Sequence, residues 1–202
     1  MRMVRSGDSY IRRDKARPVI GGPRTDIEIR VAGSDDPETS AAIIEAVASW
    51  GASEGFPNWT PGTLTGPDSV GLSRLRGDIA TKSLYLVWRG DSPVATFSLL
   101  ERDPVFWPDA GDDALYLHRF AVRRAAAGAG RHAVAWCLRE ARRRRRSFVR
   151  LDCLAENPGI RRYYERFGFI AVDETVIDGT RYSLYEAPVA AALRITPALH
   201  DR

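Results

Sequence analysis

The spacing of apolar residues changes repeatedly along the chain, and these changes predict alternating strands and helices. Alternating or continuous apolar runs predict strands at 27–31, 84–88, 94–100, 115–122, 147–154, 169–176 and 181–185. Apolar residues at helical spacing predict helices at 36–50, 68–80, 131–143 and 160–166. The turn at 89–93, with sequence RGDSP, predicts a hairpin. This order of elements indicates an α/β (α+β) protein.

The two ends of the chain lack this periodicity. Residues 1–25 mix charge, glycine and proline, so we expect a flexible N-terminal arm. Residues 26–190 are expected to form one domain, because a chain of 202 residues with 44% apolar residues can bury one good core. Residues 191–202 form the C-terminal tail, which we expect to be a short helix or disordered. The long connections are the loops 51–67 and 101–113.

Composition narrows the class of protein. The net charge of +4 is carried by arginine, since Lys15 and Lys82 are the only lysines, and this bias indicates a GC-rich bacterial genome. No apolar run could span a bilayer, and the basic N-terminus lacks the apolar segment of a secretory signal. Cys137 and Cys153 lack metal-ligand spacing and are expected to be core residues. We therefore expect a cytoplasmic protein with no membrane segment and no metal site.

The most specific signal lies between residues 115 and 169. An apolar strand leads into the loop Ala127-Gly128-Ala129-Gly130, then a helix, a second strand, and a block containing Asn157, Tyr164 and Gly168-Phe169. A glycine loop at a helix start suits anions, because free backbone N–H groups converge there. The combination resembles the GNAT superfamily of Gcn5-related N-acyltransferases over most of residues 26–187. The resemblance implies a mixed, mostly antiparallel sheet flanked by helices, with a strand–loop–helix site for pantetheine and pyrophosphate.

The resemblance implies an acyl donor, acetyl-CoA or another acyl-CoA, and a set of donor-binding residues. The family's loop pattern is Gln/Arg-x-x-Gly-x-Gly/Ala, and it falls either on Ala127 to His132 or two residues earlier. Both frames lack the Gln/Arg, and in the first frame His132 replaces the final small residue, so an imperfect diphosphate cradle is expected. Alternatively, Gly128 and Gly130 only let the strand and helix approach closely. The implied donor-binding residues are Phe120, Ala121, Val122, Ala127, Gly128, Ala129, Gly130, Arg131, His132 and Asn157.

Acyl transfer to an amine by direct attack needs a base for the amine and an acid for the leaving thiolate. The resemblance places the acid at Tyr164; its neighbour Tyr163 is expected to be wall or core. His118, two residues before Phe120, stands where many relatives carry a glutamate base, and Glu101 is the rival base. Each has a structural alternative: a core aromatic for Tyr164 and a half-buried, loop-bonded side chain for His118. Asn157 could equally be a helix cap.

The acceptor is expected to be a small-molecule or peptide amine between the loops 51–67 and 103–113, contacted by Trp59, Trp107 and Asp103. The run Arg142, Arg143, Arg144, Arg145 and Arg146 ends a predicted helix. It is either a solvated helix end, which the helix dipole favours, or a docking patch for an acidic carrier protein. No aromatic residues interleave with the run, so a specific nucleic-acid module is not expected.

Two rival functions stay open. One keeps the chemistry but takes the donor from the phosphopantetheine arm of an acyl-carrier protein or from an aminoacyl-tRNA, for example in bacterial secondary metabolism. The other is a GNAT-like binding or regulatory protein that has lost catalysis. The departures in the glycine loop permit both rivals, whereas the presence of Tyr164 and Asn157 argues against an inactive protein. The sequence carries no prediction of oligomeric state.

Overall fold

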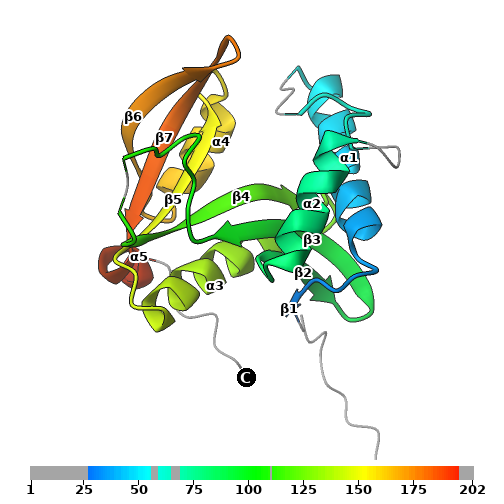
Figure 1. The fold of residues 1–202 in the computed structure, drawn as a ribbon, viewed down its shortest axis with the longest axis horizontal. Helices are drawn as coiled ribbons and strands as arrows, with labels where there is room; N and C mark the ends of the chain where they lie inside the picture. The colour runs from blue at the N-terminus through cyan, green and yellow to red at the C-terminus, as the bar shows by residue number, and fades with distance from the viewer. Residues whose placement is uncertain (1–26, 56–58, 65–68, 110, 196–202) are drawn as a thin grey trace, which may run out of the picture.

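The computed structural model describes residues 27–55, 59–64, 69–109 and 111–195 (Figure 1). The expected N-terminal arm and residues 196–202 of the expected tail lie outside this part of the chain. The strands are β1 (Ile27–Val31), β2 (Leu84–Arg89), β3 (Ser92–Leu100), β4 (Ala114–Val122), β5 (Phe148–Leu154), β6 (Ile170–Ile177) and β7 (Thr180–Pro188). The helices are α1 (Pro37–Ser53), α2 (Val70–Ala80), α3 (Ala129–Arg143), α4 (Pro158–Glu165) and α5 (Val189–Ile195).

The strands form one seven-stranded sheet in the order β1-β2-β3-β4-β5-β7-β6. Neighbouring strands are antiparallel except β4 and β5, which are parallel and are connected through α3. A parallel pair needs such a crossover, whereas the antiparallel pairs β2–β3 and β6–β7 are joined by tight turns. The expected mixed, mostly antiparallel sheet flanked by helices is confirmed.

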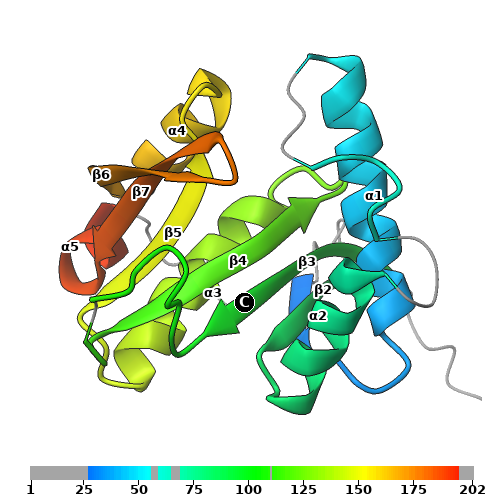
Figure 2. The same ribbon diagram turned by 45° about the horizontal axis from the view of Figure 1, so that its top comes forward.

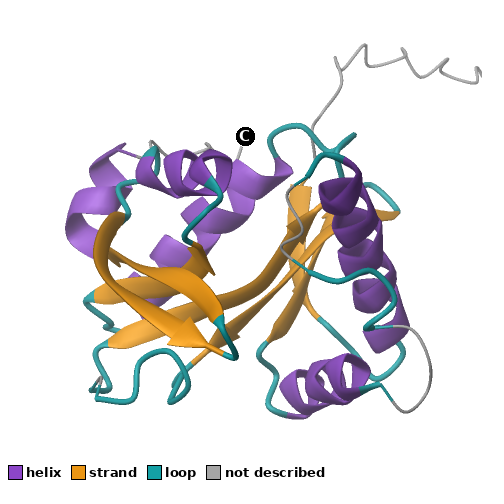
Figure 3. Cartoon of the chain, turned by 90° about the horizontal axis from the view of Figure 1, so that it is seen from above, coloured by secondary structure: helices purple, strands orange, loops and turns teal. Residues whose placement is uncertain are grey.

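The centre of the sheet is buried on both faces, which explains the continuous apolar run in β2. Leu84 and Leu86 pack with α1 and α2, whereas the alternating Tyr85 and Val87 pack with α3. The two helix groups lie on opposite sides of the sheet, as Figure 3 shows. The core against α3 is the larger one and also holds Tyr164 of α4.

Several helix ends differ from the predicted positions, each for a local reason. α1 continues to Ser53, so Gly51 lies in the helix rather than in the following loop. α3 begins at Ala129 because Gly128 adopts φ +85°, a left-handed conformation that favours glycine, directly before it. α4 begins at Pro158, where proline suits the first helical turn. α5 spans the expected domain boundary at 190 and packs against α3, so the folded core continues to Ile195.

Among the described residues, no helix has the length and apolar character needed to cross a membrane.

Candidate active site

β4 and β5 pair only at their beginnings and then separate (Figure 2). The parallel register joins Ala114–Tyr116 to Phe148–Arg150, although β4 continues to Val122 and β5 to Leu154. β5 remains paired with β7 along its whole length, and β4 remains paired with β3. The sheet therefore opens at its centre, and side chains from the unpaired ends of both strands face the opening.

A bulge in β4 directs side chains into this opening. His118 lies opposite Ser98 and Ala121 opposite Thr96, so Arg119 and Phe120 together oppose the single residue Phe97. Such a bulge bends its strand and redirects its side chains. Arg119 takes a positive φ of 49°, and its guanidinium donates to the carboxylate of Asp78 on α2, which holds the bulge in place.

A cavity of about 690 Å³, here called the large cavity, lies between α1 on one side and α4 on the other. Phe120 and Val122 of β4 line it, whereas Ala121 points to the opposite face and packs with α1 and α2. Four arginines also line it: Arg123, Arg124, Arg131 and Arg162. None of its described lining residues is acidic. The cavity is therefore apolar at its base and positively charged around its edge.

The glycine loop forms one end of the large cavity. Gly128 and Gly130 line the cavity, and the first helical hydrogen bond from this turn runs from His132 N–H to the Gly128 carbonyl (3.0 Å). The N–H groups of Gly130 and Arg131 precede that bond, and such first-turn donors lack intrahelical acceptors. A Cβ on Gly130 would lie less than 3.0 Å from the hydroxyl of Tyr163 on α4. Glycine at this position therefore lets α4 pack directly against the loop.

A second cavity of about 300 Å³, the small cavity, adjoins the large one. Trp59, Phe120, Ile160 and Tyr164 line both cavities and mark their junction. The small cavity is also lined by His118 of β4, Asp152 of β5, Phe106 and Tyr182, with Arg74 of α2. It combines aromatic walls with one acidic group, one imidazole and the guanidinium groups of Arg74 and Arg119, of which Arg119 is paired with Asp78.

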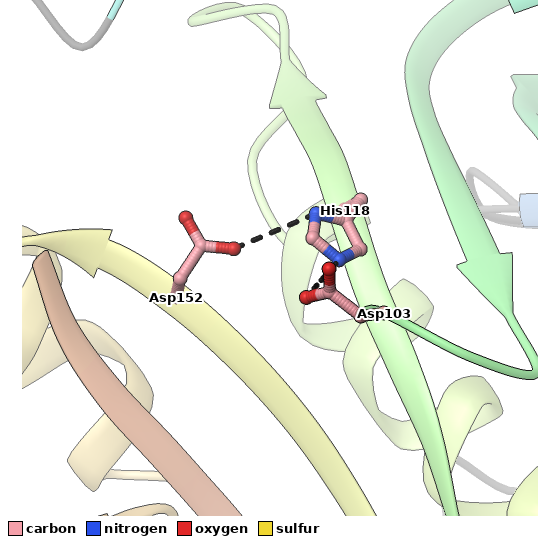
Figure 4. A group of neighbouring side chains, drawn as sticks. All are labelled: Asp103, His118 and Asp152. Atoms are coloured by element: carbon pink, nitrogen blue, oxygen red, sulfur yellow. Dashed lines mark hydrogen bonds and ion pairs between the residues drawn. The ribbon is translucent and has the colours of Figure 1, made fainter. Parts of the chain in front are cut away.

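His118 lies between two aspartates, as Figure 4 shows. Its Nε2 is 3.0 Å from Oδ2 of Asp103, and its Nδ1 is 3.5 Å from Oδ1 of Asp152. All three side chains are largely buried, with 13%, 6% and 16% exposed for His118, Asp103 and Asp152. Burial raises the pKa of Asp152 from 3.8 to about 6; His118 opposes this rise and Asp103 adds to it. The group is well placed for proton transfer near neutral pH.

Tyr164 lies at the junction of the two cavities, and Asn157 lies nearby on the large-cavity side. Burial raises the pKa of Tyr164 well above its ordinary value, so its hydroxyl stays protonated at neutral pH. The Asn157 side chain accepts hydrogen bonds from the N–H groups of Gly159 and Ile160, both at 3.1 Å, and so caps α4. Asn157 also lines the large cavity. Asn157 therefore caps α4 and also lies beside the expected donor site.

Glu101 lies away from both cavities. Its carboxylate accepts hydrogen bonds from Arg144 and Arg146, each at 2.7 Å. Partial burial raises the pKa of Glu101, but these hydrogen bonds outweigh it and leave the pKa below its ordinary value. The same contacts occupy part of the arginine run, and Arg143 pairs with Glu140. Three of the five arginines, Arg143, Arg144 and Arg146, are therefore engaged within the chain.

Other expected site residues lie elsewhere. Trp107 lines a third cavity of about 400 Å³ inside the loop 101–113, here called the loop cavity, and stacks under the guanidinium of Arg150. Its neighbour Phe106 lines the small cavity instead. His132 was expected to crowd the glycine loop, but it does not line the large cavity. The Ala127 carbonyl accepts a hydrogen bond from Arg89 at 2.6 Å. Ala129 is buried beneath the loop.

The sequence prediction missed Asp152, Phe106, Tyr182 and Arg162. Asp152 shares the half-buried face of β5 with Arg150, so the alternation in FVRLDCL does not distinguish it, and the register with β4 is needed to identify it. It lies four residues after Phe148, and His118 lies four residues after Ala114, the register partner of Phe148. The two polar residues thus occupy equivalent positions on the parallel strands.

The fold and the site together define an acyltransferase. The family model of the acetyltransferase (GNAT) family matches residues 53–169, and the chain belongs to this family and is an N-acyltransferase enzyme. The chain is also 27% identical over 164 residues to an uncharacterized N-acetyltransferase, YesJ, of Bacillus subtilis. That match covers 78% of this chain and 87% of the relative.

Solved structures share the fold. An acetyltransferase of the GNAT family from Listeria monocytogenes matches with a TM-score of 0.64 and 20% identity over 80% of this chain and 94% of its own. One from Streptococcus agalactiae matches with a TM-score of 0.63 and 16% identity, covering 80% and 95%. The PaiA N-acetyltransferase of Thermoplasma acidophilum, solved in complex with coenzyme A, matches with a TM-score of 0.60 and 14% identity, covering 80% and 98%.

Proposed function

We propose that this enzyme transfers an acyl group, acetyl foremost, from acyl-CoA to a primary amine by direct attack. The observation that carries the proposal is the position of Tyr164 at the junction of the large and small cavities. A thioester reaching down the large cavity would meet an amine in the small cavity at this junction. A protonated phenol there can supply the proton that the leaving thiolate needs.

Charge supports coenzyme A as the donor. The four arginines at the edge of the large cavity and the N-terminus of α3 suit a diphosphate, since cations and helix N-termini both attract phosphate groups. The apolar base formed by Phe120, Val122 and Ile160 suits the pantetheine arm and its acyl group. The Thermoplasma acidophilum relative was solved with coenzyme A, which agrees with this donor.

The small cavity suits an amine that arrives as an ammonium ion. Asp152 offers a negative charge, and Phe106, Tyr182 and Trp59 offer aromatic faces that attract cations. The reaction forms the C–N bond of the amide and breaks the C–S bond of the thioester. The thiolate receives a proton from Tyr164, and the ammonium gives up a proton to the group around His118.

A covalent enzyme intermediate is not part of the proposal. Cys153 lines the small cavity, but burial raises the pKa of its thiol to about 12, with Asp152 adding to the rise. Cys137 lines neither cavity, and burial raises its pKa further. A thiolate is the nucleophilic form of cysteine, and both residues disfavour it strongly.

The arginine run gives little support to a carrier-borne donor. It lies at the C-terminal end of α3, whereas the glycine loop lies at the N-terminal end. A helix of 15 residues is about 20 Å long, so the run stands well away from the mouth of the large cavity. The ion pairs of Arg143, Arg144 and Arg146 reduce the positive charge that the run can offer to a partner.

The test compares Arg131→Gln with Arg142→Gln, two exposed positions at opposite ends of α3. Calorimetry with coenzyme A should show micromolar binding by the wild type. Arg131→Gln should weaken binding roughly tenfold, the loss expected for one charged hydrogen bond to phosphate. Arg142→Gln should leave it unchanged. The donor would instead be a carrier protein if the wild type did not bind coenzyme A, turned over with an acyl-carrier protein, and lost that turnover on Arg142→Gln.

A further inference from the structure

His118 has a different neighbour on each edge of its ring, and the two neighbours face different cavities. Asp103, on the Nε2 side, lines the loop cavity. Asp152, on the Nδ1 side, lines the small cavity together with His118 itself. One edge of the imidazole therefore points toward the expected acceptor, while the other points away from it into the loop 101–113.

We propose that Asp103 is a positioning residue that fixes His118 as the Nε2–H tautomer, and that Asp152 holds the acceptor ammonium against the free Nδ1. The inference rests on the proposed function, because it names the base of that reaction and the charge state in which the acceptor binds.

The contact distances favour this tautomer. Nε2 and Asp103 are at hydrogen-bond distance (3.0 Å), and Asp103 is the more buried of the two aspartates. A buried carboxylate without a donor is costly, so the ring proton belongs on Nε2. Asp103 also accepts from the N–H of Phe106 (3.3 Å), which ties the carboxylate to the loop and fixes its orientation. Phe106 in turn lies beside the ring, with its centroid 6.1 Å from that of His118.

The other edge then lacks a hydrogen. With Nε2 protonated, Nδ1 is an acceptor, and it faces the acceptor Oδ1 of Asp152 at 3.5 Å. Two acceptors at this separation repel each other unless a donor joins them. An ammonium ion carries several N–H donors and a positive charge, so it can bond to both atoms at once. The arrangement thus selects amines that enter protonated and places one of their protons on Nδ1.

The proton balance is consistent with this division of tasks. The ammonium nitrogen loses one proton to His118 before attack, and its lone pair forms the bond to the thioester carbon. The C–S electron pair leaves with sulfur, which receives a proton from Tyr164. The second proton of the attacking nitrogen restores the tyrosine hydroxyl. One proton remains on the imidazolium, which Asp103 and Asp152 stabilise from both edges until it passes to solvent after product release.

A shared metal ion fits the same residues less well. One donor atom from each of Asp103, His118 and Asp152 lies within 4.8 Å of the others. However, Asp103 faces Nε2 and Asp152 faces Nδ1 of the same imidazole, and a single metal ion binds only one of these two nitrogens. In the described part of the chain, the charged and titratable groups that surround His118 are Asp103, Asp152, Arg119, Arg74, Cys153, Tyr164 and Tyr182.

The first test needs no turnover. The chain contains three histidines, so ¹⁵N-histidine NMR with His118→Gln for assignment isolates the His118 signals. At pH 8 the wild type should show a protonated Nε2 and an unprotonated Nδ1. A dominant Nδ1–H tautomer would overturn the proposal whatever the reaction is. Tight stoichiometric zinc in the purified protein, lost together with activity on chelation, would also overturn it.

The second test compares Asp103→Asn with Asp112→Asn. Both aspartates line the loop cavity, but the Asp112 side chain is 68% exposed and its carboxylate pairs with Arg102 at the surface. Asp103→Asn should lower kcat by roughly 10²-fold and move the acidic limb of kcat/KM to lower pH, because a negative charge beside the imidazolium is lost. Asp112→Asn should match the wild type. Equal profiles for both variants would refute the role of Asp103.

The third test separates binding from positioning. Asp152→Asn should raise KM for the acceptor about tenfold or more, with little change in KM for the donor. An unchanged acceptor KM would remove Asp152 from the proposal. A wild type that acylates no amine would instead refute the proposed function, and the NMR result would still decide the tautomer.

Discussion

Substitution of Gly130 by alanine should change the free energy of unfolding, and the sign of that change depends on one neighbouring atom. Gly130 lies in the first turn of α3, where alanine is normally favoured over glycine by up to about 1 kcal/mol. Here the new methyl group would lie less than 3.0 Å from the hydroxyl oxygen of Tyr163. Its next contacts, Val122 Cγ2 at 3.4 Å and Tyr163 Cζ at 3.5 Å, are close to ordinary. The hydroxyl alone creates the clash.

The magnitude follows from these distances. The tyrosine ring must move by about 1 Å to restore van der Waals contact, and overpacking of this kind costs about 1–3 kcal/mol. Ring contacts with Tyr164 (5.4 Å between centroids) and Phe167 (5.1 Å) resist the movement. After subtracting the gain in helix propensity, Gly130→Ala should lower the free energy of unfolding by about 1–2 kcal/mol. In a Tyr163→Phe background it should instead be neutral or stabilising by up to about 1 kcal/mol.

The assay is a double-mutant cycle by urea unfolding, with coenzyme A binding measured on each of the four proteins. The coupling between the two substitutions should be about 1–3 kcal/mol, equal to the overpacking cost. Weaker coenzyme A binding should accompany Gly130→Ala and recover in the double variant, because the loop regains its position. Additive effects on stability would show that α4 does not pack against the glycine loop as described.

Three further predictions concern protons and thiols. Folding raises the pKa of Asp152 to about 6, so ionisation of this carboxyl destabilises the native state progressively from about pH 4 and fully above about pH 6. Asp152→Asn should therefore raise the free energy of unfolding at pH 7 by about 1–3 kcal/mol. A variant that is no more stable than the wild type at pH 7 would contradict this prediction. His118→Ala should remove the acidic limb of the kcat/KM profile, whereas Glu101→Gln should keep it; the reverse pattern would make Glu101 the base. Cys137 and Cys153 should resist iodoacetamide at pH 8 in the folded protein, since burial raises both pKa values, and rapid labelling without unfolding would disprove their burial.

The elements of the fold were predictable because each one carries its own periodic signal. All seven strands and four of the helices were placed within a few residues, and the short α5 was one of two alternatives for the tail. The ends that moved depend on single residues, such as the left-handed Gly128 before α3. The bulge at Arg119–Phe120 could not be predicted, because it arises from the register with β3 and from the contact with Asp78 on α2.

The candidate site was only partly predictable for a related reason. His118 and Tyr164 lie on regular elements, whose faces follow from spacing. Asp103, Phe106 and Trp107 lie on the loop 101–113, where no periodicity indicates which side chain turns inward. The loop places the half-buried Phe106 beside the small cavity and turns Trp107 toward Arg150, whereas residue type favoured Trp107 for the cavity. Asp152 required the parallel register of β4 and β5 to be known first.

The central claim is that Tyr164 supplies the proton to a thiolate leaving at the junction of the two cavities. The most direct test measures the turnover of Tyr164→Phe with acetyl-CoA and a primary amine that the wild type acetylates. The release of free thiol monitors the reaction. The account predicts that kcat falls by roughly 10²-fold or more, while the Kd of coenzyme A measured by calorimetry stays within about twofold of the wild-type value. A wild-type kcat in this variant would contradict the account.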